Sequence, residues 1–135
     1  MGGSIKGMSL KITTMTTVVV VIVFSVWLFA NLKQRTEIAD LRGNQEVSIV
    51  LTDEGYRPRN VLIDVGTRVT FSTTRNNNHW PASNLHPSHE IYSEFDPKRP
   101  LGPSEEWTFI FNKKGEWGMH DHIRSYYTGV IYVSE

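Results

Sequence analysis

The sequence predicts an all-β sandwich domain that is preceded by a single membrane-spanning helix. Three observations lead to this expectation. Residues 12–32 form an uncharged, strongly apolar run near the N-terminus. The later part of the chain alternates apolar and polar residues in short segments separated by turns, which is typical of strands. No segment of that part repeats apolar residues with the 3.6-residue period of a helix.

Composition excludes several classes of function. The 135 residues suffice for one domain. The chain has 14 basic and 14 acidic residues, and a net charge of zero argues against a general nucleic-acid-binding protein. It has no cysteine, which excludes disulfides, thiolate zinc sites, iron–sulfur clusters and cysteine nucleophiles. No pair of acid–base groups or activated nucleophile stands out, so ordinary hydrolysis is not indicated.

The apolar run follows a short N-terminal tail, residues 1–11, and has the length of a membrane span. A helix needs ~20 residues to cross ~30 Å of hydrocarbon, and residues 12–32 meet this requirement. A core helix of a soluble protein is disfavoured, because so small a domain cannot surround a helix that is apolar on all sides. A cleaved signal peptide with Val18–Ala30 as its apolar core is the competing interpretation. Leu28 would then stand where a small residue is required, so we favour an uncleaved anchor.

Residues 33–44 are expected to form a stalk between the span and the domain. The segment KQRTEIADLR (33–42) contains no helix breaker and is predicted to extend the helix into water, until Gly43 and Asn44 end it. Charges on the two sides of the span nearly balance and leave its orientation open. The basic residues concerned are Lys6 and Lys11 before the span, and Lys33, Arg35 and Arg42 after it.

Period-two alternation predicts strands at residues 47–53, 60–65, 68–73, 106–112, 115–122 and 128–135. Trp107, Phe109 and Phe111 are expected on one face of their strand, directed into the core. A long loop rich in Asn, Pro, Ser and His lies between Thr74 and Pro103. Loops of this length in compact domains are usually functional. Tyr92, Phe95 and Asp96 are expected to attach this loop to the sandwich.

All five histidines lie in two clusters, which points to a metal site. His79, His86 and His89 are in the long loop, and His120 and His122 lie near the last turn. His120 and His122 are two positions apart in a strand-like segment, so their side chains project to the same face. Neutral imidazole is the commonest protein ligand for metals, and loops at one end of a sandwich can bring two clusters together.

The order of these segments resembles that of the cupredoxins, the copper-binding Greek-key sandwiches, over residues 45–135. The features that match are GYRPRNVLIDVGTRVTF (55–71), a polar loop that ends in His79, a late aromatic strand and the closing strand TGVIYV (128–133). The run Gly115–His122 is similar to the Gly-x-aromatic-x-x-His-x-His segment in the first domain of multicopper oxidases. His79-Trp80 likewise resembles their His-Trp-His motif, although Pro81 replaces its second histidine.

The resemblance implies a cupredoxin fold whose copper site contains no thiolate. In the register of a type 1 site, Asp121, Arg124 and Tyr127 stand where Cys, His and Met would be. His79, His120 and His122 are therefore the expected ligands of copper(II), and His86 and His89 complete the shell or form a second site. Imidazole donors suit copper(II), zinc or nickel, and the Irving–Williams order puts copper first. Asp121 and Glu90 are candidate oxygen ligands or orienting residues, and Met119 is a thioether ligand or a core residue.

Three functions are compatible with these features. The first is a membrane-anchored copper-binding protein for copper handling or electron transfer, with a redox or copper-transfer partner that the sequence does not identify. The second is a small type 2 copper oxidoreductase, and the third is a metal-free binding or structural module. We expect a single-pass protein whose C-terminal domain is extracytoplasmic, because a copper site is best kept away from reducing thiols.

Overall fold

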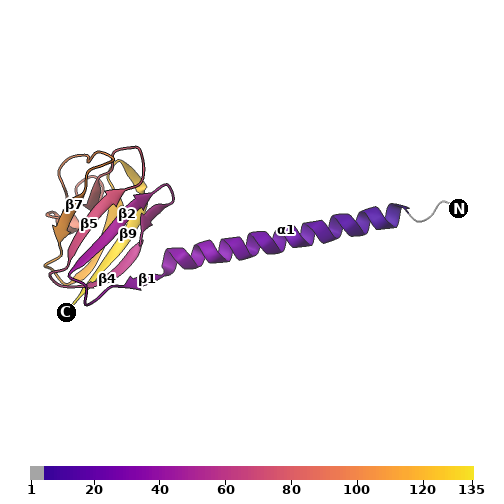
Figure 1. Cartoon of the computed structure of the whole chain (residues 1–135), viewed down its shortest axis with the longest axis horizontal. Coiled ribbons are helices and arrows are strands. Elements are labelled where there is room, and N and C mark those ends of the chain that lie inside the picture. Colours follow the sequence, from indigo (N-terminus) through magenta and orange to yellow (C-terminus); the bar gives the residue numbers. More distant parts are fainter. Residues whose placement is uncertain (1–4) are drawn as a thin grey trace. The chain divides into compact units, whose positions relative to one another are not determined.

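The computed structural model describes residues 5–135, with side chains from Met15 onward except for those of residues 34–36. The chain divides into two compact units, one that ends at Thr36 and one that comprises Glu37–Glu135. The first is a single helix and the second is a two-layered β-domain (Figure 1).

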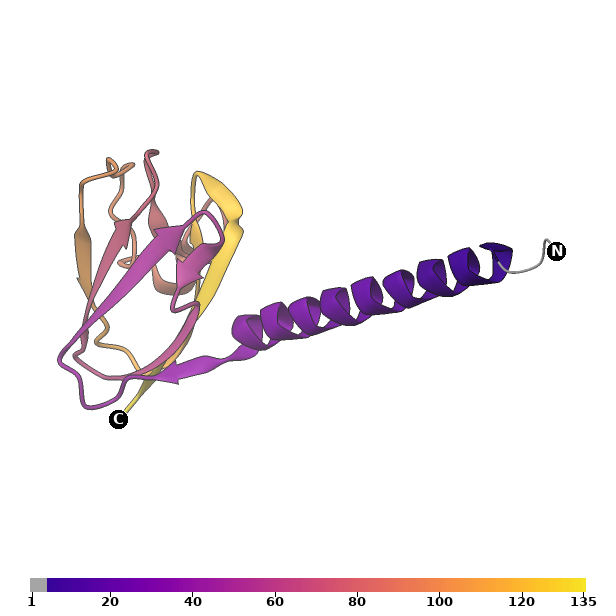
Figure 2. The same ribbon diagram turned by 45° about the vertical axis from the view of Figure 1, so that its right-hand side comes forward.

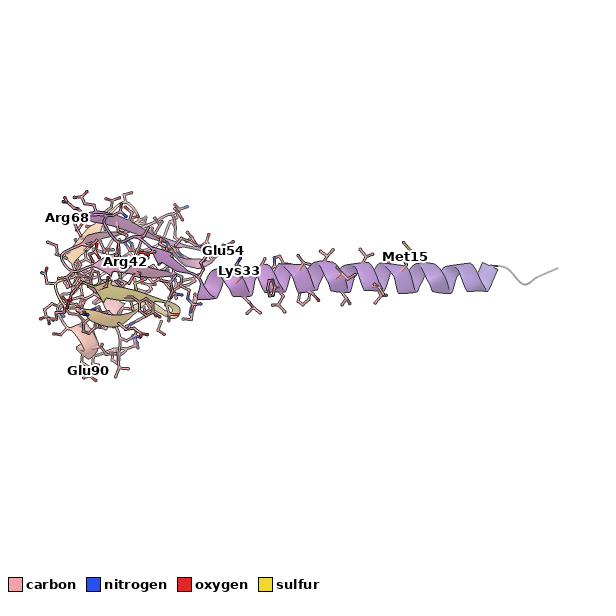
Figure 3. All side chains as sticks on the ribbon, turned by 90° about the horizontal axis from the view of Figure 1, so that it is seen from below. Met15, Lys33, Arg42, Glu54, Arg68 and Glu90 are labelled. Carbon is pink, nitrogen blue, oxygen red and sulfur yellow. The ribbon has the colours of Figure 1, made fainter. Side chains whose placement is uncertain are left out.

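Helix α1 (Ile5–Thr36) is apolar on all sides over most of its length. The stretch Met15–Lys33 has a mean hydropathy of 2.2, and none of it is buried within the structure. Side chains project from the helix in all directions between Met15 and Lys33 (Figure 3). The Ser25 hydroxyl donates to the Val21 carbonyl at 2.8 Å, which satisfies a polar group without water. The helix is thus long and apolar enough to cross a membrane, and a signal sequence has the same character.

The helix ends earlier than the sequence suggests. It was expected to continue through residues 33–42, but α1 ends at Thr36, and Ile38–Asp40 form strand β1, which pairs in parallel with β4. Ala39 and Leu41 pack against the domain core. Pairing with a sheet and burying these two side chains outweighs the local helix preference of the segment. Much of the predicted stalk is therefore part of the globular unit.

The domain consists of two sheets packed face to face. Figure 2 shows the two layers, with the yellow strand β9 on one side and β7 on the other. The five-stranded sheet has the order β1-β4-β9-β8-β6, and the four-stranded sheet has the order β3-β2-β5-β7. The bounds of the remaining strands are β2 (Glu46–Thr52), β3 (Gly55–Arg57), β4 (Asn60–Asp64), β5 (Arg68–Thr73), β6 (Pro81–Ser83), β7 (Trp107–Ile110), β8 (Gly115–Asp121) and β9 (Arg124–Ser134).

The predicted strands are confirmed to within a few residues. Their alternating apolar side chains fill the space between the two sheets. Residues such as Ile49, Val61 and Ile131 are completely buried. A cluster of aromatic rings adds to this core. Phe95 contacts Phe71, Trp107, Phe109 and Phe111 with ring centroids 5.1–5.7 Å apart. The domain is therefore all-β, with its two sheets packed face to face around this core.

The long segment between β5 and β7 is fastened to the sandwich rather than free. It contains β6 and the short 3₁₀ helix η1 (Glu90–Tyr92). The side chains of Tyr92 and Phe95 are buried in the core, as expected from the sequence. The Ser83 hydroxyl accepts a hydrogen bond from the Tyr92 amide at 2.8 Å, and the Ser83 amide donates to the Phe95 carbonyl at 3.0 Å. These contacts hold residues 84–89 against the end of the five-stranded sheet.

Candidate metal centre

Four histidines from two distant segments meet at the end of the domain opposite the C-terminus. His120 is in β8, and His122 lies in the tight connection between β8 and β9, whose tip is at that end in Figure 2. His86 and His89 lie between β6 and η1. Strand β6 pairs antiparallel with β8, with Ala82 opposite His120, so the chain that follows β6 passes directly beside β8. We call His86, His89, His120 and His122 the four-histidine group.

The four imidazoles direct one nitrogen each toward a common centre. These four nitrogens all lie within 4.8 Å of one another. His86 Nδ1 is 3.3 Å from His120 Nε2, and His89 Nε2 is 2.8 Å from His122 Nδ1. His89 and His120 are buried, His122 is half-buried and His86 is exposed. Four nitrogen donors at this spacing can surround one metal ion.

Two of the rings are oriented by partners on their far side. His120 Nδ1 is 3.1 Å from Asn84 Oδ1, and His89 Nδ1 is 2.7 Å from Asp96 Oδ2. Both partners are oxygens that only accept hydrogen bonds, so each Nδ1 carries the proton. The lone pair of each ring is then on Nε2, which faces the centre. Hydrogen bonds of this kind fix the tautomer and the direction of a metal-binding histidine.

Asp96 joins several parts of the site. Besides His89, it accepts hydrogen bonds from Trp80 Nε1 at 2.8 Å and from the Lys98 amide at 2.7 Å. Burial by itself would raise the pKa of Asp96, but the hydrogen bonds from His89, Trp80 and Lys98 outweigh it and hold the pKa well below its usual value. Asp96 is therefore ionised. Its negative charge lies on the far side of the His89 ring from the common centre.

Trp80 supports the opposite ligand. Its ring packs on the His122 imidazole with a centroid distance of 4.3 Å. Its carbonyl accepts a hydrogen bond from the His122 amide at 2.8 Å, which ties the β8–β9 connection to the long segment. Trp80 is thus held by Asp96 and in turn holds His122.

Two members of the group, His120 and His122, have lowered pKa values, which favours metal binding. Burial, and then the proximity of His89, His86 and His122, lowers the pKa of His120 to about 4. Burial, followed by the neighbouring histidines, also lowers the pKa of His122. Only neutral imidazole has a free lone pair. His120 and His122 therefore present free lone pairs and no positive charge at pH 7.

These shifts predict a pH-dependent stability of the metal-free protein. The folded pKa of His120 is about 4, and its unfolded value is about 6.5. Between these values the unfolded chain binds a proton that the folded chain does not. The free energy of unfolding should therefore fall as the pH drops from about 6.5 to 4, by up to about 3 kcal/mol for this residue. Denaturant titration in the presence of a chelator measures it.

The control is the His120→Gln variant, which removes this titration. Asp121 acts in the opposite direction, because burial raises its pKa, and it is present in both proteins. A variant that loses stability with falling pH as steeply as the wild type would contradict the assignment.

His79 lies outside the four-histidine group, although the sequence favoured it as a ligand. Its backbone pairs with Leu101 through hydrogen bonds of 3.0 and 2.8 Å. Its side chain is fully buried, and neither ring nitrogen has a hydrogen-bond partner among the described residues. Burial lowers the pKa of His79, so the ring is an uncharged part of the interior.

The other candidate ligands also lie apart from the centre. Asp121 is buried and accepts hydrogen bonds from the Trp80 amide at 2.7 Å and from Arg124 at 3.4 Å. Glu90 is on the surface, at the edge of the domain in Figure 3. Met119 is a core residue. Sequence reasoning missed Asn84, because only the pairing of β6 with β8 shows that its side chain reaches His120.

Comparisons with known proteins agree with this architecture. No protein-family model matches the chain, and neither does any curated protein. Among solved structures, the purple cupredoxin from Nitrosopumilus maritimus superposes with a TM-score of 0.57 over 65% of this chain and 99% of its own, at 22% identity. The chain has the cupredoxin fold. Amicyanin superposes on this cupredoxin-like domain with a TM-score of 0.57 at 14% identity, over 68% of this chain and 85% of its own.

A larger enzyme contains the same fold as one part. The Cu-containing nitrite reductase from Thermus scotoductus SA-01 superposes with a TM-score of 0.56 at 22% identity, over 67% of this chain but only 22% of its own. Identities this low establish the fold of the domain and not its activity. The cupredoxin fold predicted from the sequence is confirmed, and it lacks the cysteine of a type 1 site.

Proposed function

We propose that the cupredoxin-like domain binds one copper(II) ion through His86, His89, His120 and His122. The observation that carries this proposal is the convergence of four imidazole nitrogens, two of them in tautomers fixed by Asn84 and Asp96. Nitrogen donors suit copper(II), which stands highest in the Irving–Williams order. The nitrite reductase with the same fold is itself a copper protein. His79 is assigned a structural role in this proposal.

The donor set favours copper handling over electron transfer. A group of four imidazoles contains no sulfur, and Met119 is buried in the core away from it. Such a site stabilises copper(II) and offers little to copper(I), which prefers thiolate and thioether ligands. We therefore propose a protein that holds copper(II). A type 2 copper oxidoreductase is the second candidate, because the exposed His86 places one side of the centre at the surface.

The test of copper binding uses the full chain in detergent. Titration with copper(II) should saturate at one ion per chain, with a spin-resonance spectrum split by four nitrogens and no intense blue colour. A saturated spectrum with fewer than four nitrogens would contradict the four-histidine assignment. The absence of stoichiometric copper would favour the metal-free binding module.

We propose further that α1 anchors the protein in a membrane and that the domain lies on the extracytoplasmic side. The length and mean hydropathy of Met15–Lys33 support the anchor, and the need to keep copper(II) away from reducing thiols supports the orientation. A cysteine introduced at Glu135 should react with an impermeant reagent in intact cells. Labelling that occurs only after lysis would contradict this orientation.

Replacing Asp96 by asparagine should lower the copper affinity by about 10- to 100-fold, the usual cost of losing a partner of a metal ligand. The amide can still accept a hydrogen bond, but it lacks the charge that favours a cation bound to His89. Glu90→Gln is the matched control, because Glu90 is an exposed carboxylate outside the group. Competition with a chromophoric chelator measures both affinities. Equal affinities in the two variants would exclude a role for the Asp96 charge.

A further inference from the structure

We infer that His86 is the displaceable ligand of the proposed copper centre, and that an external imidazole takes its place there. This inference rests on the proposed copper site and adds to it a point of exchange. In this inference the external imidazole is the histidine side chain of a protein that receives or delivers copper. Copper would then pass between the two proteins while the partner's histidine occupies the position of His86.

His86 is held much less firmly than its three neighbours. It is the exposed member of the group. Its Nδ1 contacts His120 Nε2 at 3.3 Å, and within the described part of the chain no group pairs with its other ring nitrogen. Its backbone makes none of the hydrogen bonds that fasten Asn84 and His89 on either side of it. Moving this ring breaks one hydrogen bond, that to His120.

Each of the other three ligands has a structural anchor. His89 is bound to the buried Asp96 carboxylate, and His120 is bound to Asn84. His122 is packed on the Trp80 ring and hydrogen-bonded to its carbonyl. Three anchored imidazoles can retain a copper ion while the fourth position changes its occupant. Ligands held in place before binding keep their affinity, since little entropy is lost on ordering them.

The His86 ring touches two other imidazoles of the group. Its centroid is 4.7 Å from that of His122 and 5.3 Å from that of His120. An external imidazole has the same planar ring and the same nitrogen lone pair, so it can make these two ring contacts and donate to the metal. Imidazole is therefore a suitable replacement.

The test compares His86→Gly with His89→Gly in the full chain. We expect His86→Gly to bind copper with an affinity lowered by about 10-fold or less, and imidazole to restore both the affinity and the four-nitrogen spectrum. His89→Gly should lose about 100-fold or more, without rescue, because its ring occupies a buried position. Nitrogen-15 imidazole should change the nitrogen splitting of the His86→Gly spectrum, which shows direct coordination.

Two controls separate the possible failures. Thermal unfolding of each variant identifies any loss of fold, and His86→Ala provides a second variant with a less flexible backbone. An equal loss of copper in folded His86 and His89 variants would overturn the inference, as would a His86 variant whose spectrum does not respond to labelled imidazole. In both cases wild-type copper binding persists, whereas its absence would overturn the proposed function itself.

Discussion

Replacing His120 by alanine should lower the copper(II) affinity by about 100-fold or more, whereas His79→Leu should change it by no more than about threefold. His120 is buried, and its Nε2 faces the centre because Asn84 occupies Nδ1. His79 is buried as well but lies outside the four-histidine group. Both histidines are buried but only His120 belongs to the group, so the two variants distinguish the effect of losing a ligand from the effect of losing a buried histidine. Copper titration of the full chain against a competing chelator measures both.

His79→Leu also tests the role of that residue in the fold. Both nitrogens of its buried ring lack partners among the described residues, so an apolar side chain of similar size removes an unsatisfied polar group. We expect the free energy of unfolding to change by less than about 2 kcal/mol. Retention of copper by His120→Ala together with its loss in His79→Leu would show that the ligand assignment is wrong.

Replacing Gly129 by alanine should destabilise the domain by about 3 kcal/mol. Gly129 lies in β9 opposite Met119, where a Cβ would collide with the Arg59 carbonyl oxygen and lie 2.6 Å from Met119 Cε. The Arg59 carbonyl accepts the Val130 amide at 3.2 Å, next to the register that joins β4 to β9. The sheet must therefore open at this point, which is close to the strand that holds His120. Denaturant unfolding measures the loss.

Gly102→Ala is the matched control for this prediction. A Cβ there would lie 3.4 Å from Glu105 Oε2, which is the end of an exposed side chain and can move. We expect its stability to stay within about 0.5 kcal/mol of the wild type. Equal stability of the two variants would mean that the β4–β9 pair tolerates the added methyl group.

Several features of this protein follow from the sequence itself. The uncharged run from residue 12 to 32 forms a helix. A helix satisfies all backbone hydrogen bonds within one segment, which an apolar run needs where water is absent. The alternation of residues such as Val69 and Phe71 predicts strands with one buried face, since successive side chains of a strand point to opposite sides. These local patterns predict an all-β sandwich, and the resemblance of the segment order to the cupredoxins implies the cupredoxin fold and a histidine site without thiolate.

Only the tertiary structure decides which histidines form the group. The sequence places His79, His86 and His89 in one loop and favours His79 as a ligand, whereas the structure groups His86 and His89 with His120 and His122. Local patterns cannot decide this, because the positions of the loop histidines depend on strand pairs formed by residues far apart in the chain. The pairing of β6 with β8 sets Asn84 beside His120, and the burial of Tyr92 and Phe95 draws Asp96 toward His89. The same kind of long-range pairing turns residues 38–40 from a predicted helix into a strand beside β4. The period of the sequence predicts the face of the strand on which a side chain lies. Contacts between distant segments determine which other side chains lie beside it.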